Sequence, residues 1–268
     1  MFSINPFAAL SATLSPAVMQ AYIVVMIVLV VVGTLYEVIH KGSARYFFQN
    51  MRKTKDARPV GGGELVSIAV QTAVVDVLAS GEFCNMRRRI AHLLGMYGFV
   101  LYVLATAVLV FNPEASAIWA QLWWLGGLMV IVSGTWFWFF IRVDVAAEGS
   151  SPFRLMKADL FILSMLASAT LGLLWAGTGG GVGVLFGLYI LATTVLFAGV
   201  PWSKFAHMFF KPAAAFEKRI TRANGTAENL PLQTRDDPEQ QKRHSMDLLK
   251  DAPMDMGLGI KREAPRHY

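Results

Sequence analysis

The sequence predicts an all-α integral membrane protein, a bundle of five transmembrane helices with its N-terminus outside and its C-terminus in the cytoplasm. Hydrophobic residues make up 55% of the 268 residues and charged residues only 16%, whereas a soluble domain is nearer a quarter charged. Five apolar stretches reach or approach the roughly 20 residues that a helix needs to cross a bilayer. Basic residues are confined to one side of these stretches, which fixes the expected orientation.

The predicted spans lie within residues 1–215, which form the expected membrane domain. A long loop, residues 41–89, is expected in the cytoplasm. Within it, residues 64–80 combine helical apolar spacing with two acids, which predicts an amphipathic helix rather than a span. The polar residues 216–268 are expected to form a flexible cytoplasmic tail that orders on a partner. The five spans are expected at residues 17–39, 90–111, 117–141, 158–176 and 182–200.

Charge determines the predicted topology. All 24 Lys and Arg residues lie in residues 41–89, 142–157 and 204–268, which hold nine, three and twelve of them. Basic loops stay in the cytoplasm, so the uncharged N-terminal residues 1–16 are expected outside. These residues lack the basic start of a signal peptide, which predicts an uncleaved first helix. The expected location is the bacterial inner membrane, and an anionic membrane surface explains the basic balance without a nucleic-acid partner.

Tryptophans cluster toward both ends of the third predicted span. Indole rings favour membrane–water interfaces, so these side chains are expected to be interfacial anchors. The alternative is that some of the rings also contact a cofactor. The residues are Trp119, Trp123 and Trp124 toward the outside and Trp136 and Trp138 toward the inside.

Cys84 is the only cysteine of the chain. One cysteine excludes an internal disulfide, a CxxC redox pair and a cysteine-ligated iron–sulfur cluster within this chain. Any redox chemistry must therefore use another carrier.

Two histidines occupy matching positions at the predicted cytoplasmic ends of the second and fifth spans. His92 lies three residues after Arg89, and His207 lies three residues after Lys204. The predicted topology places both at nearly the same depth. Two imidazoles from facing helices can be the axial ligands of one six-coordinate haem b. The alternative is a pair of interfacial histidines without a cofactor.

The neighbours of these histidines suit a haem. Ala91, Gly95 and Ala206 are small and are expected to leave room for a flat macrocycle. The basic residues Arg87–Arg89 and Lys204 could pair with its propionates.

Glu37 and His40 form a second polar pair, near the inner end of the first span. Their i, i+3 spacing puts both on one side of a helix. One copy of Glu-x-x-His predicts an interfacial polar cluster more strongly than a metal site, because di-iron bundles need two copies and further carboxylates.

Two motifs resemble a known family. They are Arg-x-x-His-Leu-Leu-x-x-Tyr-Gly-Phe at residues 89–99 and Pro-Trp-Ser-Lys-Phe-x-His-Met-Phe at residues 201–209. With five predicted helices, they resemble the nitrate reductase gamma-subunit superfamily of quinone-reactive cytochromes b, which includes the membrane subunit of heterodisulfide reductase. Residues 144–149 and 156–161 are most similar to the small membrane proteins associated with adenylylsulfate reductase.

The resemblance implies a membrane anchor and electron-transfer subunit without catalytic residues of its own. Two-haem members carry two histidines on each of two helices, so His92 and His207 imply a single haem b. Tyr97, Glu37 and His40 become candidates to hydrogen-bond a quinone carbonyl. The implied partner is a cytoplasmic flavin and iron–sulfur adenylylsulfate reductase, which oxidises sulfite with AMP and whose electrons pass to quinone.

Two other functions remain open. One is a redox-silent membrane anchor for a soluble oxidoreductase. The other is a small transporter, which is disfavoured because no charge or broken helix interrupts the middle of the spans.

Overall fold

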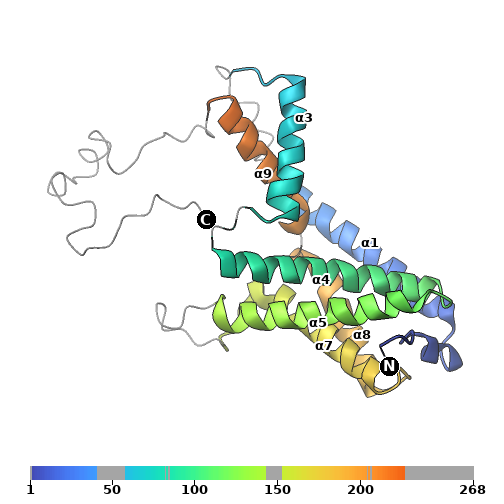
Figure 1. Ribbon diagram of the computed structural model, residues 1–268. Helices are drawn as coiled ribbons and strands as arrows, with labels where there is room; N and C mark the ends of the chain where they lie inside the picture. The colour runs from blue at the N-terminus through green and yellow to red at the C-terminus, as the bar shows by residue number, and fades with distance from the viewer. Residues whose placement is uncertain are drawn as a thin grey trace.

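The protein is described by a computed structural model. All regular elements in the described part of the chain are helices (Figure 1). The described residues are 2–40, 58–81, 83, 85–142, 153–203, 205 and 207–226. The expectations for residues 41–57 and for the rest of the tail, residues 227–268, lie outside them.

Four of the described helices are long and apolar enough to cross a membrane, and a fifth apolar helix is shorter. At about 1.5 Å per residue, the 15 residues of α8 extend about 22 Å, less than the roughly 30 Å hydrocarbon core. The short 3₁₀-helix η4 (Val200–Trp202) follows it. The prediction of an all-α membrane bundle is confirmed. The helices are α1 (Pro16–His40), α4 (Met86–Phe111), α5 (Ala117–Phe140), α7 (Leu160–Gly177) and α8 (Val184–Ala198).

Glycines let α4 and α5 approach closely. A Cβ atom at Gly98 would lie 2.6 Å from the Cβ of Met129, and one at Gly126 would lie 2.6 Å from the backbone nitrogen of Tyr102. Small residues at such crossings are typical of membrane helix pairs, because they bring the backbones into contact. On α5, Gly127 faces Leu173 of α7 in the same way. These glycines therefore fix α5 between α4 and α7.

A projecting arm is built from segments distant in the sequence. It consists of α3 (Gly62–Gln71), the π-helix η2 (Thr72–Leu78) and α9 (His207–Ala223). In Figure 1 these helices lie side by side and run across the direction of α4 and α5. The arm confirms the amphipathic helix predicted at residues 64–80.

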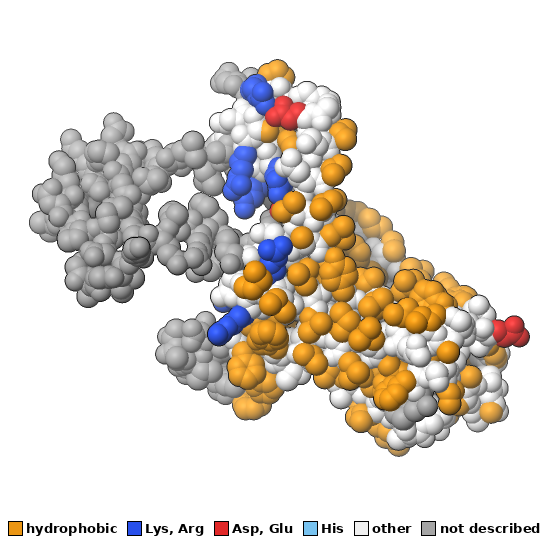
Figure 2. All heavy atoms as spheres, in the orientation of Figure 1, with side chains coloured by type: hydrophobic (Ala, Val, Ile, Leu, Met, Phe, Trp, Pro, Cys, Tyr) orange, Lys and Arg blue, Asp and Glu red, His pale blue; other side chains and the backbone are white. Residues whose placement is uncertain are grey.

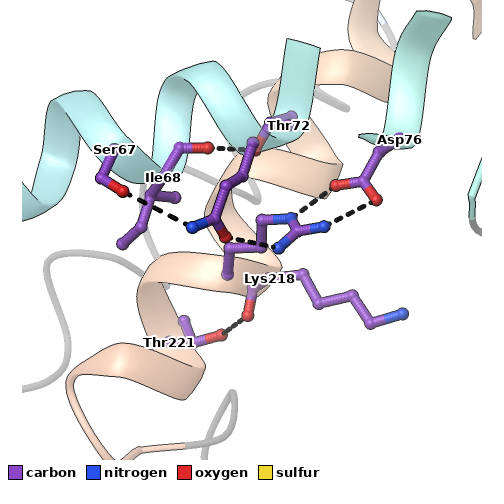
Figure 3. A network of polar contacts seen from close by, with 8 residues as sticks. Ser67, Ile68, Thr72, Asp76, Lys218 and Thr221 are labelled. Carbon is purple, nitrogen blue, oxygen red and sulfur yellow. Dashed lines mark hydrogen bonds and ion pairs between the residues drawn. The ribbon is translucent and has the colours of Figure 1, made fainter. Parts of the chain in front are cut away.

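The arm also corrects the predicted domain boundary. The tail was expected to begin at residue 216, but that position lies inside α9. Arg219 of α9 donates to both carboxylate oxygens of Asp76, at 2.6 and 2.9 Å, and to Oε1 of Gln71 at 3.1 Å (Figure 3). A sequence that reads as polar tail is therefore folded here, because α3 and η2 supply a partner surface.

Aromatic side chains fill the two halves of the bundle. The arm end, predicted to be cytoplasmic, contains a cluster of phenylalanines. The far end, predicted to be outer, contains stacked pairs: Tyr102 and Trp123 with centroids 5.1 Å apart, and Trp175 and Tyr189 at 5.6 Å. The far end is covered by the N-terminal segment, where Phe7 packs against Trp123 and Trp175.

The prediction that tryptophans anchor the bundle at both interfaces is wrong for Trp123, Trp124 and Trp138. All three are buried within the protein. Trp123 donates its indole N–H to Oγ1 of Thr106 at 2.9 Å, and the guanidinium of Arg142 lies 4.1 Å from the ring centroid of Trp138. These indole rings pack against other side chains of the protein. Their sequence positions near the ends of the predicted span were therefore not enough to predict that they are buried.

Candidate functional site at the arm end of the bundle

The start of α4 positions the residues predicted to hold a cofactor. Asn85 is the N-cap of this helix, and its side-chain oxygen accepts hydrogen bonds from the backbone N–H groups of Arg87 and Arg88. Such a cap satisfies N–H groups that have no partner in the first turn. The cap fixes where the helix begins, and His92 consequently lies in its second turn.

His92 contacts the chain that leads from the arm into α4. Its Nδ1 lies 3.0 Å from Oγ of Ser80, and its ring centroid lies 4.7 Å from that of Phe83. Ser80 is almost fully buried and has a positive φ of 49°, a conformation uncommon outside glycine. Ser80 thus holds the imidazole at Nδ1, and Phe83 packs on a face of the ring.

Two other predicted cofactor residues bind the same stretch. Arg89 donates Nε–H to the carbonyl oxygen of Ala79 at 2.8 Å, and Tyr97 donates its hydroxyl to the carbonyl oxygen of Leu78 at 2.8 Å. The helix η2 ends at Leu78, and the last carbonyl groups of a helix have no hydrogen-bond donor within the helix. Arg89 and Tyr97 supply donors to two such carbonyl groups. We call these contacts of Arg89, His92 and Tyr97 with residues 78–83 the clamp.

The structure brings the closing motif alongside the same face of α4. Phe205 is buried, with its ring centroid 6.1 Å from that of Phe99 and 5.2 Å from that of Phe161. Phe99 follows His92 by seven residues, or two turns, so both lie on one side of α4. His207 begins α9 two residues after Phe205. The side chain of His207 and all of Lys204 lie outside the described residues, so a short distance between the two imidazoles stays a prediction.

One of the small residues near His92, Gly95, does not have the role expected of it. Ala91 is buried, and a Cβ atom at Gly95 would lie 2.8 Å from Oγ of Ser133 on α5. Gly95 therefore belongs to the packing of α4 on α5, and the space expected beside it for a macrocycle is filled. Ala206 lies outside the described residues.

His92 itself fits the role of an axial ligand. Iron-ligating histidines are oriented by a hydrogen bond to the other ring nitrogen, and Ser80 makes such a bond to Nδ1. Ligation would then use Nε2. Among the described residues, no group of three or more His, Cys, Asp or Glu side chains could hold another metal ion.

Glu37 and His40 lie in different surroundings. Glu37 is buried, one turn after Gly33, whose Cβ would lie 3.0 Å from the Cβ of Val200. That face of α1 packs against η4. His40 is exposed and stacks on Tyr36 with ring centroids 5.0 Å apart. Glu37 is therefore the one of the two that faces the closing motif.

Sequence reasoning missed a buried ion pair at the arm end. Arg142, just after α5, donates Nε–H to Oδ1 of Asp159 at 2.7 Å and also contacts Oδ2. Both side chains are buried, and the hydrogen bond to Asp159 raises the pKa of Arg142 above its ordinary value. The pair joins the end of α5 to the start of α7. The sequence signal for this ion pair was the presence of opposite charges, Arg142 and Asp159, on the two sides of the connection between the third and fourth predicted spans.

Comparisons with known proteins give one limited likeness. Over 164 residues the chain is 29% identical to citrate utilization protein B of Escherichia coli, an alignment that covers 56% of this chain and 43% of that protein. The chain thus matches less than half of the length of this curated relative. No family model and no solved structure matches the chain.

Proposed function

We propose that this protein is the membrane subunit of an oxidoreductase complex, which holds a cytoplasmic enzyme at the bilayer and passes its electrons to quinone through one haem b. The observation that supports it most is the setting of His92. This histidine is oriented through Nδ1 by Ser80 at the arm end, on the face of α4 that contacts the segment leading to His207. Histidines on two different helices, one of them following the segment that packs on α4, suit bis-imidazole ligation.

The clamp supplies the geometry for this role. If Nδ1–H donates to Oγ of Ser80, the tautomer is fixed with the lone pair on Nε2, which is the form that ligates iron. Phe83 covers one ring face and limits rotation of the imidazole. Haem b, when bound, supplies a one-electron carrier. Arg89 and Tyr97 act as positioning residues, because their polar groups bind backbone carbonyls of residues 78 and 79.

The partner that the motifs favour is a flavin and iron–sulfur adenylylsulfate reductase. In that pairing, electrons from sulfite oxidation leave through this chain to quinone, and Glu37 on the buried face of α1 is the candidate to bind a quinone carbonyl.

The name of the curated relative refers to citrate utilization, which favours a second candidate partner, a soluble enzyme of citrate utilization. Co-purification from the native membrane distinguishes these two partners.

A visible spectrum tests the haem. The purified protein reduced with dithionite is expected to show b-type absorption bands, and His92→Ala or His207→Ala is expected to abolish them while the protein still inserts. His40→Ala is the matched control, because His40 stacks on Tyr36 on an exposed face, and it should keep the bands. Ser80→Ala should keep the bands but shift the midpoint potential, because it removes the hydrogen bond to Nδ1.

The alternative is a redox-silent anchor. The clamp is compatible with this role as well, because the contacts of Arg89, His92 and Tyr97 also join α4 to the arm without a cofactor. Wild-type protein that inserts fully and shows no b-type bands after expression with added haem precursor would establish the anchor and overturn the haem.

A further inference from the structure

The arm has one wholly apolar side that no described residue covers. Val66, Val70, Val74 and Leu78 recur at every fourth position of α3 and η2, and all four are exposed, by 65, 57, 51 and 51%. The lipid-facing valines of α1 are exposed to the same degree, with 52% for Val28. We call these four residues the apolar row. Its exposure equals that of the apolar residues along α1, a candidate membrane span.

The π-helix keeps this row straight. In an α-helix, every fourth residue drifts by about 40° around the axis. In η2 the backbone N–H of Ala79 donates to the carbonyl of Val74, five residues earlier, at 2.9 Å. This bonding widens the turn and so offsets the drift.

The opposite side of the same helix packs on α9. Ile68 and Thr72 are buried there, and Asp76 binds Arg219. Residues two positions apart lie on nearly opposite sides of a helix, so this row and the apolar row face away from each other. The arm is therefore two-sided.

The base of the arm lies beside the first turns of α4. Tyr97 is eleven residues after Met86, where α4 begins, or about 16 Å along the helix. Its hydroxyl binds the carbonyl of Leu78. The neighbouring carbonyl of Ala79 accepts from Arg89, which belongs to the arginine run expected at the polar boundary. Leu78 is thus held between the level of Arg89 and that of Tyr97 on α4.

The arm runs sideways from that point. In Figure 1, α3 crosses the direction of α4 rather than continuing it into the cytoplasm. In Figure 2, hydrophobic side chains gather along one edge of the arm and Lys and Arg side chains along the other. On α9, Lys211, Lys218 and Arg222 share one side by their spacing of seven and four. Lys218 points away from the ion-pair network in Figure 3.

From these placements we propose that the arm lies in the cytoplasmic interface of the bilayer, with the apolar row among lipid acyl chains and the basic residues of α9 at the headgroups. The apolar row adjoins the apolar surface of the bundle at the level between Arg89 and Tyr97, where that surface meets the polar boundary. A helix with apolar and basic sides binds such an interface in its plane. The proposal does not depend on haem or quinone.

Nitroxide labels test the position of the arm. With Cys84 replaced by serine, labels are placed through Val70→Cys or Val74→Cys in the full chain, in nanodiscs of phosphatidylethanolamine and phosphatidylglycerol without any partner protein. Val28→Cys on α1 is the control for lipid, and Lys218→Cys is the control for the polar side. Collision rates with oxygen and with a water-soluble nickel chelate are measured for each label.

Labels at 70 and 74 are expected to match the one at 28, with nickel collisions about tenfold below those at 218. Nickel collisions nearer to those at 218 would overturn the proposal and make the row a docking site for protein. A second measurement guards against local unfolding by the label. In unlabelled protein, amide exchange of residues 62–78 should slow on transfer from detergent to nanodiscs, and unchanged or faster exchange would contradict the lipid contact.

Discussion

At the scale of single residues, two glycines determine how near α4 and α5 come. Gly98 contacts Met129 and the carbonyl of Gly126, and Gly126 contacts the backbone at Tyr102. Without a hydrophobic driving force between helices in lipid, this close packing is a main source of their association. The polar residues of the clamp depend on it, because α5 supports the face of α4 that adjoins His92.

A methyl group at Gly98 should therefore be costly. Gly98→Ala places a Cβ 2.6 Å from the Cβ of Met129 and 3.0 Å from the carbonyl oxygen of Gly126, and overpacking of this kind costs about 1–3 kcal/mol. Gly187→Ala in α8 is the matched control, since nothing lies within 4 Å of its Cβ position. It should be neutral or stabilise by roughly 0.5–1 kcal/mol. Thermal unfolding in one detergent compares them, and equal midpoints would contradict the close crossing.

At the scale of elements, the arm depends on contacts between distant parts of the chain. The side chain of Asp76 is 11% exposed and that of Arg219 is 28% exposed, and two hydrogen bonds join them. A second pair, Arg58 with Glu64, is 60% and 38% exposed. Exposed pairs contribute little because solvent screens them, whereas the loss of one partner from a less exposed pair leaves a charge without compensation.

Breaking the first pair should loosen the arm. Asp76→Ala is expected to lower the free energy of opening of α3 by about 1.5–3 kcal/mol, the usual worth of hydrogen bonds to charged groups. Glu64→Ala, the matched control, should change it by less than about 1 kcal/mol. Hydrogen exchange of residues 62–78 measures both. Similar effects of the two substitutions would show that the arm is held by its apolar contacts alone.

At the scale of the whole molecule, the excess of basic residues lies in the segments that adjoin the spans in the sequence. Residues 204–226 hold five basic residues and one acid, and the loop 41–89 holds nine and four. Residues 227–268 hold seven basic residues and eight acids, so this part of the tail is nearly neutral. An acidic soluble partner would therefore be attracted mainly by the edge of the bundle.

Docking should follow that distribution. Arg87→Glu with Arg88→Glu is expected to weaken co-purification of the soluble enzyme at low salt and to remove most of its sensitivity to salt above about 0.15 M. Glu114→Gln, a charge change at the far end, is the control. A chain ending at Thr226, which keeps α9 intact, should still dock in a salt-sensitive way. Loss of docking in that chain alone would assign the contact to the tail instead.

Apolar length and charge placement were enough to predict the spans. The helices α1, α4, α5, α7 and α8 begin and end within four residues of the predicted spans, because a bilayer requires long runs of apolar residues that few other structures contain. The same reasoning predicted the amphipathic helix at residues 64–80 but not its partner, since α9 comes about 130 residues later in the chain.

The sequence by itself thus determined an all-helical membrane bundle, and it predicted two histidines as cofactor ligands. Only the tertiary structure decided what their neighbours do: Gly95 packs against α5, and Arg89 and Tyr97 hold the carbonyls at the end of η2. The physical reason is that the preference of a segment for a membrane depends only on its own residues. A hydrogen bond or a close contact depends in addition on which other segment packs against it. Pairings such as Asp76 with Arg219 join residues 143 positions apart, and no local pattern encodes them.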